Sequence, residues 1–257
     1  MQITIHNLTK CFGPLRANND VSLDFAGGQI HGVLGENGAG KSTLMKLISG
    51  YLRPDAGTLA LDGQTLLLRG PGDALRAGVG MVHQEPLDVP AFTVLENLIC
   101  AAPRQAIPSR AVGRAKLLEL AQQLHFSLEP DAPIAQLTMG QRQQLEIVRL
   151  LLCGARALIL DEPTTGITAA QVRALFAALR QLAQQGSTIL FVSHKLNEVA
   201  DLCNTVSVLR AGQLVGSQLT MPQPQAQLLQ LMFGQKHLAT FPPSPTTWER
   251  GPGGEGH

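Results

Sequence analysis

Residues 35–42 read Gly35-Glu-Asn-Gly-Ala-Gly-Lys41-Ser42, which fits the pattern G-x-x-x-x-G-K-[ST]. The segment follows a short apolar strand, Ile30–Leu34, and precedes a helical stretch, Thr43–Ser49. Its glycines let successive backbone N–H groups turn inward around a phosphate, and the helix N-terminus adds partial positive charge. In such a loop Lys41 would reach the β- and γ-phosphates and Ser42 would hold Mg²⁺. The alternative is a glycine-rich turn with a solvated lysine, and the strand–loop–helix order disfavours it.

The composition bounds the kind of protein. The chain has 257 residues, 20 Lys and Arg against 19 Asp and Glu, a net charge of +1 and 44% hydrophobic residues. Because so much apolar content must be buried, disorder over most of the length is excluded. The near-neutral balance provides no long-range field for nucleic acid, and no apolar run reaches the ~18–20 residues that span a bilayer. The N-terminus lacks the layout of a signal peptide and the four cysteines are scattered, so we expect a soluble cytosolic protein without a nucleic-acid partner.

Hydrophobic periodicity predicts strands and helices in alternation, interrupted by an all-helical insertion of roughly 65 residues, well beyond ordinary loop lengths. We expect a two-residue turn at Asp62-Gly63 inside a hairpin, and a capping box at the start of the helix that Thr168 opens. Strands are expected at 3–8, 21–25, 30–34, 78–83, 157–160, 188–192 and about 205–209, and helices at 43–49, 110–124, 141–152 and 168–185. Residues 241–257 are rich in proline and glycine, which predicts a flexible tail.

Two carboxylates, Asp161 and Glu162, follow the apolar strand Ala157–Leu160. Parallel α/β sheets bind ligands at the carboxyl ends of their strands. Asp161 would complete the Mg²⁺ shell, and Glu162 would polarise the attacking water as general base. The alternative, a surface pair opening a loop, is disfavoured because a phosphate loop is present in the same chain.

Two further polar residues follow predicted strands. His194 ends the strand around Phe191-Val-Ser, and Gln84 ends the strand around Gly80-Met-Val-His just where the helical insertion begins. A lone histidine is more often structural, but its place at a strand end in a phosphate-loop protein favours a role in the site. Gln84 would sense the γ-phosphate at the hinge of the insertion.

The segment Leu137-Thr-Met-Gly-Gln141 precedes a long helix. Thr138 and the Gly140 amide would present donors to an anion at the helix start. The equally weighted alternative is an ordinary N-cap, with Thr138 capping the helix.

Taken together, these segments resemble the ATP-binding cassette of ABC transporters over about residues 1–220, and they occur in the family's order. Residues 35–42 resemble the Walker A motif, residues 157–162 the Walker B motif with its catalytic glutamate, and residues 137–141 the signature motif. Gln84 resembles the Q-loop glutamine, and His194 resembles the switch histidine.

The resemblance implies an α/β P-loop fold with a mixed core sheet, an antiparallel β subdomain and an inserted α-helical subdomain. The nucleotide-binding core would span residues 1–85 and 151–220, the helical subdomain 86–150 and a C-terminal helix about 221–240, in one domain of residues 1–240. Catalytic roles would fall to Glu162, His194, Gln84 and Lys41, and Mg²⁺ would bind Ser42, Gln84 and Asp161. ATP would contact Phe12, which stands where the family has an adenine-stacking aromatic, and Gly35, Glu36, Asn37, Gly38, Ala39, Gly40, Lys41, Ser42, Thr43, Gln84, Thr138, Gly140, Gln141 and Asp161.

The resemblance also implies partners. Two cassettes of the family dimerise head to tail, with each ATP between the Walker A motif of one and the signature motif of the other. Finer details resemble importers of simple sugars or nucleosides, which implies permease subunits, an extracytoplasmic solute-binding protein and a place at the cytoplasmic face of the membrane. Since importers of this group usually carry two cassettes in one chain, we expect a partner or a second copy to supply the other.

Two residues depart from the family pattern. Met139 replaces the first glycine of the signature, and Thr168 stands where the family usually has an aspartate. They motivate an alternative, a regulatory cassette with weakened turnover. A repair or translation protein of the same superfamily is a further alternative, but the chain has neither a long coiled coil nor a basic linker.

Overall fold

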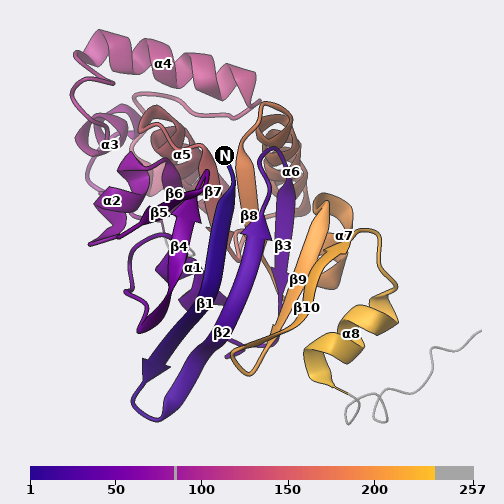
Figure 1. Cartoon of the computed structure of the whole chain (residues 1–257). Coiled ribbons are helices and arrows are strands. Elements are labelled where there is room, and N and C mark those ends of the chain that lie inside the picture. The colour runs from indigo at the N-terminus through magenta and orange to yellow at the C-terminus, as the bar shows by residue number, and fades with distance from the viewer. Residues whose placement is uncertain (84–85, 235–257) are drawn as a thin grey trace, which may run out of the picture.

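The computed structural model describes residues 1–83 and 86–234. Two sheets and a set of helices make up this part of the chain (Figure 1). The strands are β1 (Ile3–Phe12), β2 (Leu15–Phe25), β3 (Ile30–Leu34), β4 (Ala56–Leu61), β5 (Gln64–Leu66), β6 (Val79–Val82), β7 (Ala157–Asp161), β8 (Thr188–Val192), β9 (Thr205–Arg210) and β10 (Gln213–Thr220). The helices are α1 (Lys41–Ile48), α2 (Pro71–Arg76), α3 (Val94–Ala101), α4 (Arg110–Gln123), α5 (Met139–Leu152), α6 (Ala169–Gln184), α7 (Leu196–Leu202) and α8 (Gln225–Phe233), with a 3₁₀ turn at Ile134–Gln136.

The larger sheet has the strand order β10-β9-β3-β8-β7-β6. Its strands pair in parallel except for β10, which pairs antiparallel with β9. The smaller sheet, β2-β1-β4-β5, is antiparallel throughout. Together with the helices carried between β6 and β7, these sheets confirm the predicted α/β architecture with a mixed core sheet.

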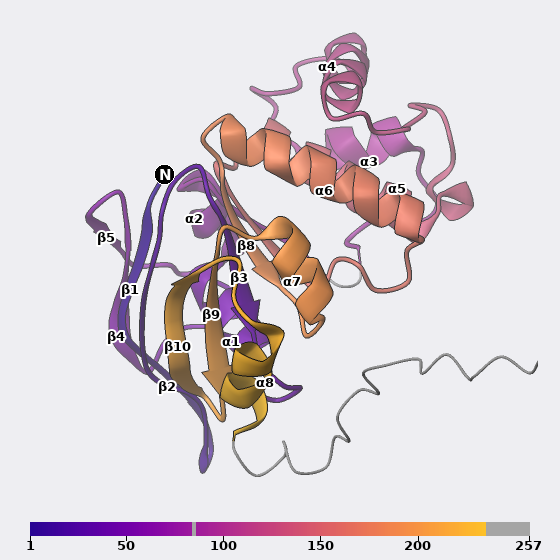
Figure 2. The ribbon, with the colours of Figure 1, turned by 90° about the vertical axis from the view of Figure 1, so that its right-hand side faces the viewer.

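Both faces of the large sheet are buried, because its strands alternate between two apolar cores. Ile159 and Leu190 pack toward the smaller sheet and α1, whereas Leu158 and Phe191 pack against α5, α6 and α7. Figure 2 shows this order, with the small sheet on one side of the large one and α6 and α7 on the other. Helices α3 and α4 lie beyond the edge strand β6, next to α5 (Figure 1).

Most of the predicted helices and strands are present, but several begin or end at other residues than predicted. The hairpin turn at Asp62-Gly63 is confirmed, since both residues have positive φ (47° and 79°) between paired Leu61 and Gln64. Strands β1 and β2 extend beyond the predicted 3–8 and 21–25, because register shifts interrupt the simple alternation on which that prediction depends.

Helices α2 and α3 and strand β10 were not predicted from the sequence. A signal for α3 was present, because Thr93 and Glu96 form a capping box directly before the buried Val94 and Leu95. Of the predicted C-terminal helix, residues 225–233 are helical and those beyond 234 lie outside the described residues, as does the predicted tail. None of the helices in the described ranges has the length and apolar character needed to cross a membrane.

Candidate nucleotide site

Three neighbouring strands deliver the predicted site residues to one edge of the large sheet. In the order β3-β8-β7, Val33 pairs with Val192 and Val192 with Asp161, all in parallel. The phosphate loop, the Asp161-Glu162 pair and the Ser193-His194 turn therefore leave the sheet at the same edge, as parallel strands require.

The phosphate loop joins β3 to α1 and is held in place by neighbouring backbone. Gly40 caps α1 with a left-handed φ of 100°, and a Cβ added there would lie 2.2 Å from the Ala17 carbonyl oxygen. Asn18 Nδ2 donates to the Gly40 carbonyl (3.2 Å), and the Gly212 N–H donates to the Ala39 carbonyl (3.1 Å). Gly38, with a φ of 82°, would meet nothing within 4 Å of an added Cβ, so this part of the loop faces open space.

Lys41 is buried, and its ammonium group lies inside the loop. Nζ donates to the carbonyl oxygens of Gly35 and Glu36, both at 2.8 Å. Burial lowers the pKa of Lys41 from its ordinary value, and the carboxylates of Glu162, Asp161 and Glu36 oppose that shift. The ammonium is thus held inside the loop by carbonyl partners that an anionic ligand can replace.

A cleft of about 730 Å³ opens beside the loop. It brings together Phe12, a residue that is 47% exposed, much of the phosphate loop, and the carboxylates of Asp161 and Glu162. Among the predicted ATP contacts, Gly35, Glu36 and Ala39 do not line the cleft; Gly35 and Ala39 are buried, and Glu36 is exposed. The lining residues are Phe12, Leu15, Arg16, Ala17, Asn37, Gly38, Gly40, Lys41, Ser42, Thr43, Asp161, Glu162, Ala211 and Gly212.

Five of these residues were missed by the sequence analysis. Leu15, Arg16 and Ala17 come from the start of β2, and Ala211 and Gly212 form the turn between β9 and β10. They are far from the loop in sequence and belong to no motif, so only the packing of the small sheet and of β9 places them beside it.

The oxygen atoms of Ser42 and Asp161 fit a divalent cation. Asp161 Oδ1 is buried without a hydrogen-bond partner, and the Ser42 side chain lies close enough to the same carboxyl group to lower its pKa. Burial raises the pKa of Asp161, the Ser42 side chain opposes that, and Glu162 adds to the increase. Hard oxygen ligands in small number suit Mg²⁺, which usually retains several waters and substrate phosphates. Gln84, the third predicted ligand, lies outside the described residues.

Glu162 and His194 contact each other at the sheet edge. His194 Nδ1 lies 2.9 Å from Glu162 Oε1, and the Glu162 N–H donates to the Val192 carbonyl (3.0 Å). Glu162 has a left-handed φ of 48°, a strained conformation that persists in proteins where the surroundings enforce it, often at functional sites. With this backbone conformation the Glu162 side chain lines the cleft instead of continuing the alternation of β7.

Glu198 at the start of α7, a carboxylate that the sequence did not single out, contacts the loops that follow β7 and β8. Its Oε2 accepts from Thr164 Oγ1 (2.8 Å) and Ser193 Oγ (3.1 Å), and its Oε1 accepts from Lys195 Nζ (3.0 Å). Thr164 follows Glu162, and Ser193 precedes His194. Glu198 therefore ties the end of β7 to the end of β8.

The signature-like segment lies apart from the cleft. Thr138 caps α5: its Oγ1 accepts from the Gln141 N–H (3.2 Å), and the Gln141 side chain accepts from the Thr138 N–H (3.0 Å). Neither these two residues nor Gly140 lines the cleft. The prediction that Thr138 caps the helix is thus confirmed. A nucleotide in this chain's own cleft would not touch the segment, so an anion bound there would have to belong to another site.

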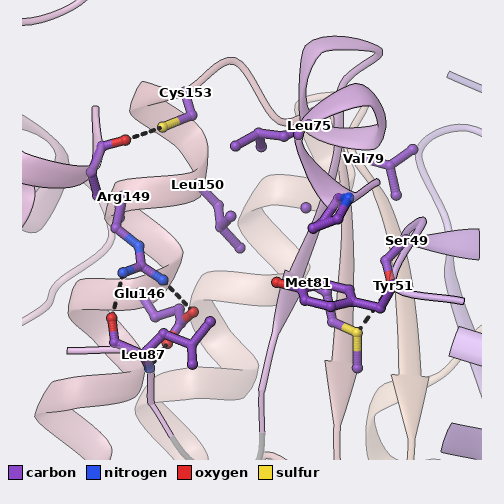
Figure 3. A pocket seen from close by; sticks show the side chains of 14 residues that line it. Ser49, Tyr51, Leu75, Val79, Met81, Leu87, Glu146, Arg149, Leu150 and Cys153 are labelled. Atoms are coloured by element: carbon purple, nitrogen blue, oxygen red, sulfur yellow. Dashed lines mark hydrogen bonds and ion pairs between the residues drawn. The ribbon is translucent and has the colours of Figure 1, made fainter. Parts of the chain in front are cut away.

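A second cavity of about 200 Å³ lies between the core and α5 (Figure 3). Its apolar lining includes Leu75, Val79 and Leu150. Arg149 also lines the cavity, where it donates to the Leu87 carbonyl (2.7 Å) and forms an ion pair with Glu146. Burial raises the pKa of Glu146, and the adjacent Arg149 opposes that shift. The cavity thus combines apolar walls with a compensated ion pair.

The fold and the cleft define a P-loop nucleotide-binding protein of the ATP-binding cassette type. Residues 18–165, more than half of the chain, match the ABC transporter family, and the chain belongs to this family. Two crystal structures support the fold: a nucleotide-free ATP-binding cassette from an ABC transporter (TM-score 0.74, 25% identity) and an ADP conformation of such a cassette (TM-score 0.74, 27% identity). Each alignment covers 84% of this chain and 90% of the other.

Among curated proteins, the chain is similar to ribose import ATP-binding proteins. RbsA 2 of Streptomyces avermitilis is 38% identical over 237 residues, which are 91% of this chain and 47% of that protein. RbsA 2 of Burkholderia ambifaria is 39% identical over 246 residues, 95% of this chain and 49% of that protein. The chain therefore spans about half the length of the curated relatives it matches.

Proposed function

We propose that the chain binds and hydrolyses ATP with Mg²⁺ to energise solute import by an ABC transporter. The observation that carries the proposal is the convergence of Lys41, Asp161 and the Glu162–His194 pair on one cleft at the carboxyl edge of a parallel sheet. The relatives are named as import proteins, which favours transport over the regulatory and non-transport alternatives.

In this proposal the phosphates of ATP lie over residues 37–43. Backbone N–H groups at the start of α1 and the Lys41 ammonium would neutralise them, and the exposed Phe12 ring at the cleft mouth would stack on adenine. Ser42 and Asp161 would hold Mg²⁺, which supplies positive charge against the developing negative charge on the phosphates.

Glu162 would act as the general base that takes a proton from the attacking water. The neighbouring His194 imidazole, 2.9 Å away, would orient that carboxylate and contact the transferred phosphoryl group. Phosphoryl transfer depends mainly on positioning and charge stabilisation. The hydrogen bonds from Thr164 and Ser193 to Glu198 would therefore support turnover by fixing the loops that carry Glu162 and His194.

A second cassette would complete each ATP site. Thr138 and Gly140 lie outside the chain's own cleft, so we propose that they face the nucleotide of a partner cassette in a head-to-tail dimer. The relatives are about twice as long as this chain, so the second cassette would come from a further part of the protein, another subunit or a second copy.

We further propose that a permease segment docks in the cavity between the core and α5, where apolar walls and the Arg149–Glu146 pair suit an amphipathic helix end (Figure 3). Such docking would place the chain at the cytoplasmic face of the membrane. The names of the relatives support a simple sugar such as ribose as solute, captured by an extracytoplasmic binding protein.

The test is a pair of substitutions assayed for ATP binding and for phosphate release. Glu162→Gln should reduce turnover by about 10²–10⁴-fold and leave ATP affinity within about 2-fold, because only the base is removed. Lys41→Ala should instead weaken ATP binding by about tenfold or more. Parental turnover in Glu162→Gln, or unchanged affinity in Lys41→Ala, would contradict the roles assigned here.

A further inference from the structure

Gln171 joins the starts of two helices. Both α5 and α6 open with a Thr-x-x-Gln capping box, at Thr138 and at Thr168. Gln171 Oε1 accepts from the Thr168 N–H (2.9 Å), and its Nε2 donates to Thr138 Oγ1 (2.9 Å). A backbone N–H can only donate, so the amide oxygen must face Thr168 and the NH₂ group must face Thr138.

This bridge determines what the Thr138 hydroxyl can do. Thr138 Oγ1 accepts from the Gln141 N–H (3.2 Å) and from Gln171 Nε2, and it donates its hydrogen to Gln141 Oε1 (3.2 Å). Two N–H donors use both lone pairs of the oxygen. The hydroxyl can therefore interact with a further group only as a donor, and only by turning its single hydrogen away from Gln141 Oε1 toward that group, as an anionic phosphate would require.

The absence of a side chain at Gly140 leaves room for the Gln171 side chain. A Cβ added at Gly140 would lie 2.8 Å from Gln171 Cδ and 2.9 Å from its Nε2. The glycine is buried in the described chain, directly under the Gln171 amide. Gln171 thus forms part of the signature-like segment although it lies 33 residues from Thr138 in sequence.

The other end of the bridge leads to the catalytic glutamate. A short loop runs from Glu162 to Thr168, with Thr164 held by Glu198 on the way. We propose that Gln171 is a positioning residue that transmits nucleotide occupancy from the Glu162 site to the signature-like segment of the same chain. The inference rests on the proposed function, in which Glu162 and Thr138 serve different ATP molecules, so Gln171 would couple the two sites.

Three variants separate the bridge from the helix cap. Gln171→Met removes the bridge and half of the α6 capping box without adding charge. Gln171→Glu keeps an acceptor for the Thr168 N–H but has no donor for Thr138. Thr168→Val is the matched control, because it removes the other half of the same box while Gln171 can still reach Thr138.

The measurement is hydrogen exchange of the backbone amides at residues 139–142 in the full chain, with and without ATP and Mg²⁺, alongside ATP affinity. Without ATP, Gln171→Met should speed exchange there roughly 3- to 10-fold, as expected for one lost hydrogen bond, and Thr168→Val should leave it unchanged. ATP should change the exchange in the parent and in Thr168→Val, and this response should be lost in both Gln171 variants.

The outcomes separate the inference from the proposed function. If the parent binds ATP but residues 139–142 do not respond, or if either Gln171 variant responds like the parent, the coupling role is wrong and ATP binding stands. If Thr168→Val behaves like Gln171→Met, the effect belongs to the cap and the inference also fails. A parent that does not bind ATP overturns the proposed function and the inference together.

Discussion

Removal of the Glu198 carboxylate is expected to loosen at once the two loops that follow β7 and β8. Glu198→Ala deletes the acceptor of the Thr164 hydroxyl (2.8 Å) and of the Ser193 hydroxyl (3.1 Å). Thr164 and Ser193 are 4% and 2% exposed, so their hydroxyls lose a partner in places that water reaches poorly. The Glu162 and His194 side chains then depend on less well supported loops.

The magnitude follows from these contacts. A hydrogen bond to a charged acceptor contributes about 1.5–3 kcal/mol, so two such bonds set a range of roughly 3–6 kcal/mol. The ion pair with Lys195 adds little, because that ammonium side chain is 43% exposed. Water entering the space left by the shortened side chain recovers part of the loss, so we expect a decrease of about 3 kcal/mol in the free energy of unfolding.

Glu198→Gln is the matched control. Its amide oxygen, at the position of Oε2, can still accept from both hydroxyls but as a neutral acceptor, so the decrease should be about half as large. Urea unfolding measures both values, and steady-state phosphate release reports alignment. We expect turnover to fall about 10²-fold in Glu198→Ala, since a displacement near 1 Å at a reacting group costs that much. Glu198→Ala within about 0.5 kcal/mol of the parent, with parental turnover, would refute this reasoning.

Two further predictions concern backbone and burial. Gly40→Ala should abolish ATP binding or destabilise the fold by more than about 2 kcal/mol, since its Cβ would lie 2.2 Å from a carbonyl oxygen. Gly38→Ala, also at positive φ but facing open space, should cost only about 1–2 kcal/mol. Equal unfolding curves for the two variants would contradict this loop geometry. Burial lowers the pKa of His31 to about 4, so the unfolded chain binds a proton that the folded chain refuses, and stability is lost as pH falls below about 6.5. Urea unfolding should show about 2 kcal/mol less stability at pH 5 than at pH 7 from this group, and His31→Asn should reduce that difference; an identical pH dependence would exclude the effect.

Local signals made much of the fold predictable. The phosphate loop, the Asp62-Gly63 turn and the Thr168 capping box each depend on residues a few positions apart, and the structure has the turn and the cap as predicted. The missed helix α3 carried the same kind of signal in Thr93 and Glu96. Where bulges break the alternation, as in β1 and β2, a periodicity argument places strand ends too early or too late.

By itself, the sequence determined which residue types bear the chemistry and in which order they occur, because motif spacing, capping and turn formation are local properties of a chain. Only the tertiary structure decided which of them meet. The cleft wall at residues 15–17 and 211–212, the Glu198 contacts to Thr164 and Ser193, and the Gln171 bridge to Thr138 all join separate elements. Such contacts depend on sheet order and on the packing of helices against the sheet, and one sequence carries no periodic signal for them.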